Sequence, residues 1–111
     1  MYNFNNKKFK LIENSEKGET SSETIFYYKQ NENLVTADYK GGNILYGKII
    51  ATIKNDELNM LYQCVTTNNE LKSGKAIAKI SKKDNRIELS LNWEWLNGDK
   101  SKGQSKYIEI D

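Results

Sequence analysis

The chain has 111 residues, 37% of them hydrophobic and 29% charged, with a formal net charge of +2. This length suits one domain, 1–111, with one modest core. With no histidine and a single cysteine, the chain lacks the usual zinc ligand sets and every histidine-dependent triad or dyad. Neither a G-x-x-x-x-G-K-[ST] loop nor a G-x-G-x-x-G turn is present. We therefore expect no metal, no cofactor and no catalytic apparatus.

From about Lys7 onward the hydrophobic pattern has a period of two. Segments rich in Ile, Val, Thr, Tyr, Phe and Trp are separated by Asn, Asp, Gly and Lys clusters, which is typical of a strand meander. The pattern predicts eight strands, near 7–13, 22–30, 33–40, 44–54, 57–65, 71–80, 86–95 and 104–110. No segment has a convincing helical stripe, and the stretch from Glu13 to Ser21 is predicted as a loop or a short helical turn.

The turns predict the register of three hairpins. A two-residue loop at Asn31-Glu32 pairs Tyr28 with Val35, Phe26 with Ala37 and Thr24 with Tyr39. A two-residue loop at Asn55-Asp56 pairs Ile53 with Leu58, Ala51 with Met60, Ile49 with Tyr62 and Gly47 with Cys64. A four-residue loop from Lys82 to Asn85 pairs Ile80 with Ile87, Ala78 with Leu89, Ala76 with Leu91 and Gly74 with Trp93.

In each hairpin one face takes nearly all the apolar and small residues. A three-residue loop with a bulge at Gly41-Gly42-Asn43 pairs Tyr39 with Leu45 and keeps this face continuous. The sequence therefore predicts an all-β fold, an eight-stranded antiparallel up-and-down barrel of the lipocalin or avidin kind. A two-sheet sandwich would show the same alternation and is the alternative.

The two ends of the predicted barrel differ. One end is lined by aliphatic residues and Tyr28, whereas the other collects hydroxyls, indoles and glycines. We expect a small amphipathic or aromatic ligand to bind at this second end, with the loop 97–103 as a lid. The candidate ligand-binding residues are Thr24, Tyr39, Tyr62, Cys64, Trp93, Trp95 and Asp99. In the alternative interpretation, the indoles fill the space left by Gly47 and Gly74, and the loop is a solvated connection.

Three groups of residues resemble those of a known family. They are Gly18-Glu19-Thr20 with Glu23-Thr24, Tyr39-Lys40-Gly41-Gly42-Asn43-Ile44 with Gly47, and Trp93-Glu94-Trp95 with Gly98-Asp99-Lys100-Ser101-Lys102-Gly103. Over nearly its whole length the chain is similar to a family of small uncharacterised bacterial proteins whose members often carry the label N-acetylglutamate synthase. The resemblance implies a common small fold and supplies no catalytic residues. The common acetyltransferase fold needs a glycine-rich turn opening a helix, and neither is visible here.

Other functions remain open as alternatives. A carboxylate-dependent enzyme would rely on Glu23, Glu94 or Asp99. Single-stranded nucleic acid or protein could bind a basic surface within 71–106 through Lys75, Lys79 and Arg86, although that region offers few outward aromatic residues, so we expect no nucleic acid partner. A homodimer could form through Ile25, Tyr27 and Leu34.

The same composition indicates a cellular location. The N-terminal lysines are followed by no apolar stretch, and the most apolar segment, 44–53, is interrupted by Lys48. We expect no signal peptide and no membrane partner. Because the lone Cys64 cannot form an internal disulfide, we expect the protein to be cytoplasmic.

Overall fold

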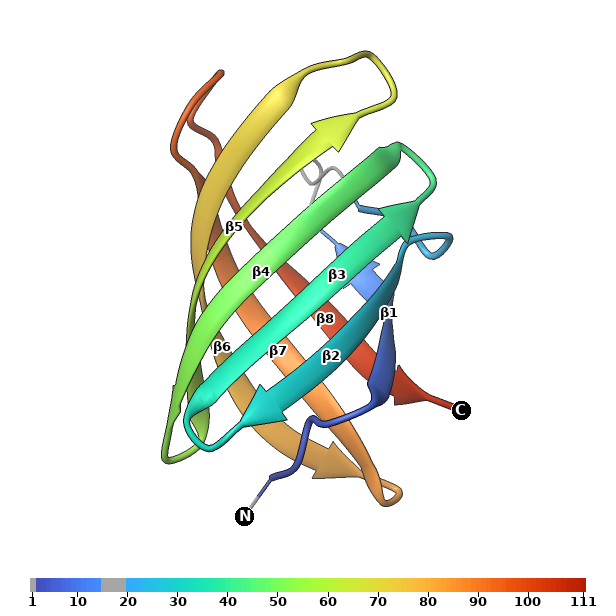
Figure 1. The fold of residues 1–111 in the computed structure, drawn as a ribbon, viewed down its shortest axis with the longest axis vertical. Coiled ribbons are helices and arrows are strands. Elements are labelled where there is room, and N and C mark those ends of the chain that lie inside the picture. The colour runs from blue at the N-terminus through green and yellow to red at the C-terminus, as the bar shows by residue number, and fades with distance from the viewer. Residues whose placement is uncertain (1, 15–19) are drawn as a thin grey trace.

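Eight antiparallel strands close into a barrel in chain order (Figure 1). The computed structural model describes residues 2–14 and 20–111, so part of the predicted turn, 15–19, lies outside the described residues. The strands are β1 (Lys7–Asn14), β2 (Ile25–Asn31), β3 (Leu34–Gly41), β4 (Ile44–Lys54), β5 (Glu57–Thr66), β6 (Leu71–Lys83), β7 (Arg86–Trp95) and β8 (Lys102–Ile110). Among the described residues, no helix is long and apolar enough to cross a membrane. The predicted all-β barrel is confirmed.

The register of the hairpins is partly as predicted. All four predicted pairs between β4 and β5 are confirmed, including Gly47 with Cys64. Two other hairpins are shifted by two residues: Tyr39 pairs with Phe26 instead of Thr24, and Gly74 pairs with Trp95 instead of Trp93. Because side chains alternate with a period of two, a shift of two residues keeps every side chain on its predicted face.

The shifts arise in the turns. The β2–β3 pairing closes between Asn31 and Leu34, which leaves 32–33 as the loop instead of the predicted 31–32. The β6–β7 pairing continues to Lys83 and Arg86, and both intervening residues, Asp84 and Asn85, have positive φ. Two left-handed residues make the tight turn that matches strand twist, so this hairpin needs two loop residues and not four.

The connection between β3 and β4 also differs from the prediction. Gly41 pairs with Ile44, and the register then shifts so that Tyr39 lies opposite Gly47. Gly41 and Gly42 both have positive φ, which allows this tight connection without the steric cost that other residues would meet. The prediction that Leu45 faces Tyr39 is wrong, since Leu45 is 52% exposed on the outer surface.

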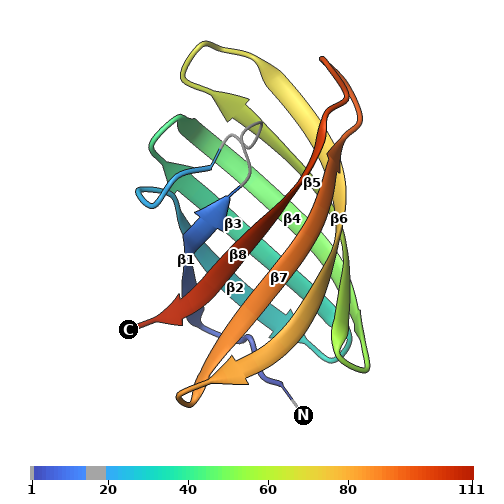
Figure 2. The same ribbon diagram turned by 180° about the vertical axis from the view of Figure 1, so that it is seen from behind.

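A bulge in β1 determines which polar side chain enters the barrel. β1 pairs with β8 to close the barrel (Figure 2). The register shifts between Leu11, opposite Tyr107, and Glu13, opposite Lys106. Because one extra residue reverses the alternation that follows it, Glu13 lies outside while Asn14 reaches the inner side opposite Ser105.

The N-terminal segment closes one end of the barrel. Phe4 precedes β1 and is fully buried, with its ring centroid 5.8 Å from that of Phe9 and 5.5 Å from that of Tyr28. The amide oxygen of Gln30 accepts a hydrogen bond from the Phe4 backbone N–H at 2.8 Å, which fixes the segment across the end of β2. Phe4 and the rings around it therefore fill this end of the barrel.

Candidate ligand site at the open end of the barrel

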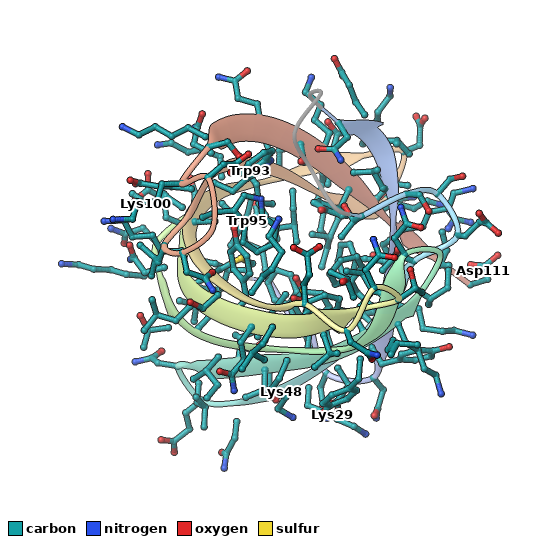
Figure 3. The ribbon with its side chains drawn as sticks, turned by 90° about the horizontal axis from the view of Figure 1, so that it is seen from above. Lys29, Lys48, Trp93, Trp95, Lys100 and Asp111 are labelled. Atoms are coloured by element: carbon teal, nitrogen blue, oxygen red, sulfur yellow. The ribbon has the colours of Figure 1, made fainter. Side chains whose placement is uncertain are left out.

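The interior of the barrel has a small cavity, of about 50 Å³, near the end opposite Phe4. Its lining is mainly aromatic and apolar, with a few polar groups. The lining residues are Asn14, Thr20, Phe26, Tyr39, Ile44, Ile49, Met60, Tyr62, Cys64, Leu91, Trp93, Trp95, Ser105 and Tyr107. Figure 3 looks into this end, with Trp93 and Trp95 close together on one side. Pockets for drug-sized ligands are roughly 300–1,000 Å³, so this cavity in its present shape holds only a few atoms.

Aromatic rings form the walls of the cavity. The Tyr62 and Trp95 rings meet edge to face with centroids 5.5 Å apart, and the Trp93 centroid lies 6.2 Å from that of Trp95. On the facing side Phe26 stacks on Tyr39 at 4.7 Å. Such contacts orient flat apolar surfaces at fixed angles, which suits the insertion of another planar group.

Two glycines explain why so little space is left. A Cβ atom at Gly47 would lie 2.1 Å from the Tyr39 ring, and one at Gly74 would lie 2.6 Å from the Tyr62 ring. Each tyrosine therefore lies directly on the backbone of the neighbouring strand. The prediction that indoles fill the space at these glycines is wrong, since tyrosine rings occupy both places.

Replacing Gly47 with alanine should force the Tyr39 ring out of its place. Because that ring is buried and stacked on Phe26, it cannot move freely, and we expect the free energy of unfolding to fall by about 1–3 kcal/mol. Urea unfolding of Gly47→Ala, Tyr39→Ala and the double variant measures the coupling. If Gly47→Ala lowers the free energy of unfolding as much in the Tyr39→Ala variant as in the native chain, contact with the Tyr39 ring does not cause the destabilisation.

A chain of hydrogen bonds crosses the polar side of the cavity. The Trp93 indole N–H donates to Ser105 Oγ at 2.7 Å, and the Ser105 hydroxyl donates to the Oδ1 atom of Asn14. The Asn14 amide donates to the Thr20 carbonyl at 3.1 Å, and the Thr20 and Tyr107 hydroxyls are 2.9 Å apart. This network links β7, β8, β1 and the end of the β1–β2 connection, and it gives the apolar cavity one polar edge.

The tyrosines of the cavity are neutral hydrogen-bonding groups. Burial raises the pKa of Tyr39, of Tyr62 and of Tyr107 above the ordinary value, because a phenolate would lose its hydration. A positive charge lies at the edge of this cluster, where Lys72 Nζ is 4.3 Å from the centroid of the Trp95 ring. The site thus combines flat apolar walls, neutral donors and one cation.

The structure gathers most of the predicted ligand-binding residues. Tyr39, Tyr62, Cys64, Trp93 and Trp95 all line the cavity. The other two, Thr24 and Asp99, do not belong to its lining. The buried Thr24 hydroxyl donates to the Gly41 carbonyl at 2.9 Å, and the exposed Asp99 carboxylate accepts from the Ser101 backbone N–H at 3.0 Å.

The loop 97–103, which was predicted as a lid, is shorter than expected, and hydrogen bonds attach its first residue to β6. Lys102 and Gly103 belong to β8. The Asn97 side chain accepts from the Ser73 N–H at 2.9 Å and donates to the Leu71 carbonyl at 3.0 Å. These two hydrogen bonds tie the β7–β8 loop to the start of β6.

Several residues of the site were missing from the prediction. Asn14, Thr20, Ser105 and Tyr107 supply the polar edge, and Lys72 lies over Trp95. Alternation along β8 would have placed Ser105 and Tyr107 inside the barrel. No sequence signal indicated the bulge that turns Asn14 inward.

The other predicted cations and carboxylates lie away from this cavity. On the outer wall, Glu94 is 3.9 Å from Lys75, and Lys79 is 2.6 Å from Glu57. Arg86 lies near the opposite end of β7, where it donates to the Glu109 carbonyl and the Asp111 carboxylate. Glu23 is exposed before β2.

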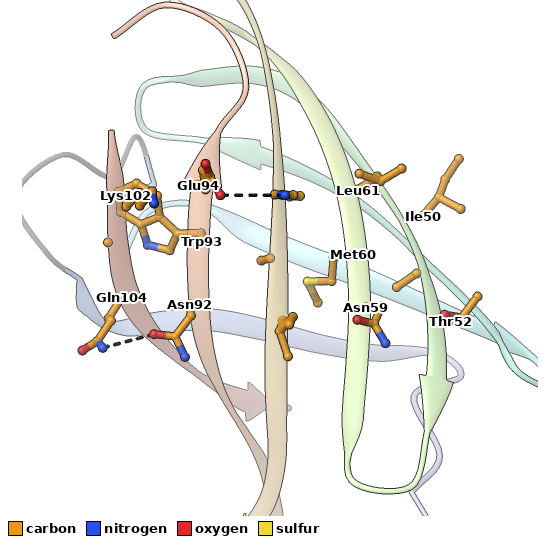
Figure 4. A pocket seen from close by; sticks show the side chains of 15 residues that line it. Ile50, Thr52, Asn59, Met60, Leu61, Asn92, Trp93, Glu94, Lys102 and Gln104 are labelled. Carbon is orange, nitrogen blue, oxygen red and sulfur yellow. Dashed lines mark hydrogen bonds and ion pairs between the residues drawn. The ribbon is translucent and has the colours of Figure 1, made fainter. Parts of the chain in front are cut away.

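A broad, open concavity of about 1,150 Å³ runs over the outer surface of β4–β8 (Figure 4). Four cross-strand neighbours lie side by side in one row across it, one on each of the strands β4 to β7: Ile50, Leu61, Lys75 and Glu94. The last two form an ion pair. The next row contains Asn92 and Gln104, joined by a hydrogen bond of 3.1 Å. This surface is too open to surround a ligand, and the predicted nucleic-acid-binding lysine on it, Lys75, is paired with an acid.

The residues proposed for a homodimer are spread over the barrel wall. Tyr27 and Leu34 are exposed, and Ile25 is partly exposed. Leu34 pairs with Asn31, four residues along β2 from Tyr27, so it lies further along the wall from Tyr27 than Ile25 does. The homodimer stays a prediction.

Comparison with known proteins identifies the kind of barrel. The model of a family described as avidin-like protein matches residues 2–110. No curated protein and no solved structure matches the sequence.

Proposed function

The chain belongs to the avidin-like family, and we propose that it is a binding module that takes one small, planar, amphipathic ligand at the open end of the barrel. The observation that carries this proposal is the cavity where flat aromatic walls meet a polar edge. Eight-stranded barrels are just wide enough to hold one small ligand, and the family match supports a binding role.

The lining determines what such a ligand offers. Its ring lies between the Trp93 and Trp95 indoles on one side and the Tyr39 ring on the other, because these surfaces are flat and apolar. Its polar edge faces the Tyr107 hydroxyl beside Ser105, which can donate because burial raises the pKa of Tyr107 and keeps it protonated. Since the cavity is only about 50 Å³, a ring enters only when an aromatic side chain near the mouth turns aside.

A variant that fills the cavity tests the proposal. Cys64 is buried in the lining, and Cys64→Leu adds a side chain of about the size of the free space. Saturation-transfer NMR with a panel of planar heterocycles and aromatic acids should detect binding to the native chain, and we expect Cys64→Leu to weaken it at least tenfold.

The matched control is Gln63→Leu, which puts the same side chain on the outer face one residue earlier. It should leave binding unchanged, and circular dichroism should show that both variants fold. The proposal fails if no compound in the panel binds the native chain, or if the two leucine variants bind equally well.

A further inference from the structure

The outer surface of β1–β4 combines exposed aromatic rings with several lysines that are in no ion pair with the described residues. We define this tyrosine wall by its outward side chains: Lys8, Lys10, Ile25, Tyr27, Asp38, Lys40, Tyr46 and Lys48. Tyr27 is 42% exposed and Tyr46 is 51% exposed. They flank a surface groove of about 340 Å³. We propose that this wall binds single-stranded nucleic acid, with bases stacked on Tyr27 and Tyr46 and the phosphate backbone held by the lysines.

Register places the two tyrosines as a pair of stacking platforms. Tyr27 on β2 lies opposite Asp38 on β3, and the Tyr46 hydroxyl of β4 donates to the same carboxylate. Neighbouring strands are about 4.8 Å apart, so the backbones of β2 and β4 are about 10 Å apart. Two bases can therefore lie on the two rings with Asp38 between them. Stacking on aromatic side chains is how sequence-tolerant single-strand binders hold bases.

The charge of the wall suits a polyanion. Its side chains as defined above include four lysines and one acidic residue, Asp38. Lys8 and Lys10 of β1 are the cross-strand neighbours of Tyr27 and Ile25. Within the described ranges, Lys8, Lys10 and Lys40 are in no ion pair, whereas two outward lysines of β6, Lys75 and Lys79, are each paired with a glutamate. Positive charge left uncompensated beside exposed aromatics is the electrostatic signature of nucleic-acid binding.

The acidic residue in the centre does not oppose this assignment. Asp38 Oδ1 accepts from Tyr46 and, at 3.1 Å, from Lys48. The hydrogen bond from Tyr46, and after it the one from Lys48, holds the pKa of Asp38 below its usual value. The carboxylate is therefore an ionised acceptor. Asp38 lines the groove between the two tyrosines, where the amino edge of a base could donate to this carboxylate.

Fluorescence anisotropy with the full chain and a labelled 12-nucleotide single-stranded DNA of mixed sequence tests the proposal, in 50–300 mM NaCl. We expect salt-sensitive binding that the double variant Tyr27→Ala/Tyr46→Ala weakens by about 10- to 100-fold. Tyr27→Phe/Tyr46→Phe keeps both rings and should stay within a few-fold of the native chain. The control Ile50→Ala/Leu61→Ala removes two exposed apolar groups from the other wall and should have no effect.

Two double-lysine variants distinguish binding at the tyrosine wall from general attraction between the DNA and the positively charged protein. Lys8→Ala/Lys40→Ala should reduce the slope of log affinity against log salt by about 1.4, roughly 0.7 for each phosphate that a lysine no longer neutralises. Lys75→Ala/Lys79→Ala changes the net charge equally and should leave the slope unchanged.

Four results would overturn the assignment. They are no binding at 50 mM NaCl, full binding by the tyrosine-to-alanine variant, equal effects of the two lysine pairs, and binding to vesicles containing phosphatidylserine without binding to the oligonucleotide.

Discussion

Replacing Phe4 with alanine is expected to lower the free energy of unfolding by about 3–5 kcal/mol. The ring is fully buried although it belongs to no strand, and it packs between Phe9 and Tyr28 at the closed end. Its removal leaves a cavity that the hydrogen-bonded strand ends cannot collapse to fill. Urea unfolding followed by circular dichroism at neutral pH measures the loss.

The control for this experiment is Leu61→Ala, at an outer-wall position that is 62% exposed. Exposed truncations of this kind change stability by about 0.5 kcal/mol or less. A loss below about 1 kcal/mol for Phe4→Ala would show that the N-terminal segment contributes little packing. Because Phe4 lies at the end opposite Trp95, ligand binding by the folded fraction should be unchanged.

The overall fold could be predicted because alternation alone decides which side chains face inward. Phe26, Ala76 and Trp93 are buried as predicted, although their partners on the neighbouring strands were wrong by two residues. The turn residues could not decide the register. The runs Asn31-Glu32-Asn33 and Asp84-Asn85 each contain more than one residue that tolerates a left-handed backbone.

The candidate site was less accessible to sequence reasoning because it depends on contacts across the barrel closure. Asn14 and Ser105 are 91 residues apart and meet only because β1 carries a bulge beside β8. Alternation likewise shows that Tyr39 and Gly47 point into one interior, but it does not show that the ring lies on the glycine. Whether the interior is filled therefore depends on exact register.

The tyrosine wall shows the same limit on the outer surface. Positive charge along the sequence is greatest between 71 and 106, so the sequence predicts any nucleic-acid surface there. The structure shows that Lys75 and Lys79 of that region are neutralised by glutamates on neighbouring strands. Tyr27 and Tyr46 come together around Asp38 because β2, β3 and β4 are adjacent. Whether a lysine attracts an anion therefore depends on whether a carboxylate of a neighbouring strand pairs with it, and not on how many lysines are close in sequence.

Raising the pH above about 10 is expected to unfold the protein steeply. Burial raises the pKa of Tyr28, of Tyr39, of Tyr62 and of Tyr107 above the ordinary value of 10.0. Below that value both the folded and the unfolded chains keep these protons, so stability is unaffected. Above it the unfolded chain loses them while the folded chain does not, and each tyrosine then lowers the free energy of unfolding by about 1.4 kcal/mol per pH unit.

Four such groups together give a decline of about 5–6 kcal/mol per pH unit, against a total stability of about 5–15 kcal/mol for a domain. Urea unfolding at several values between pH 8 and 11 should therefore show a plateau and then a steep fall. Neighbouring tyrosines provide a matched pair of variants: Tyr28→Phe should reduce the slope by about a quarter, whereas Tyr27→Phe, on the outer face, should not change it. If all seven tyrosines gave the absorbance of tyrosinate near pH 10 while circular dichroism still showed a folded barrel, the buried phenols would not be the cause. The interior would then be open to water at the end where Trp93 and Trp95 lie, and the cavity would already admit a ligand without any side chain turning aside.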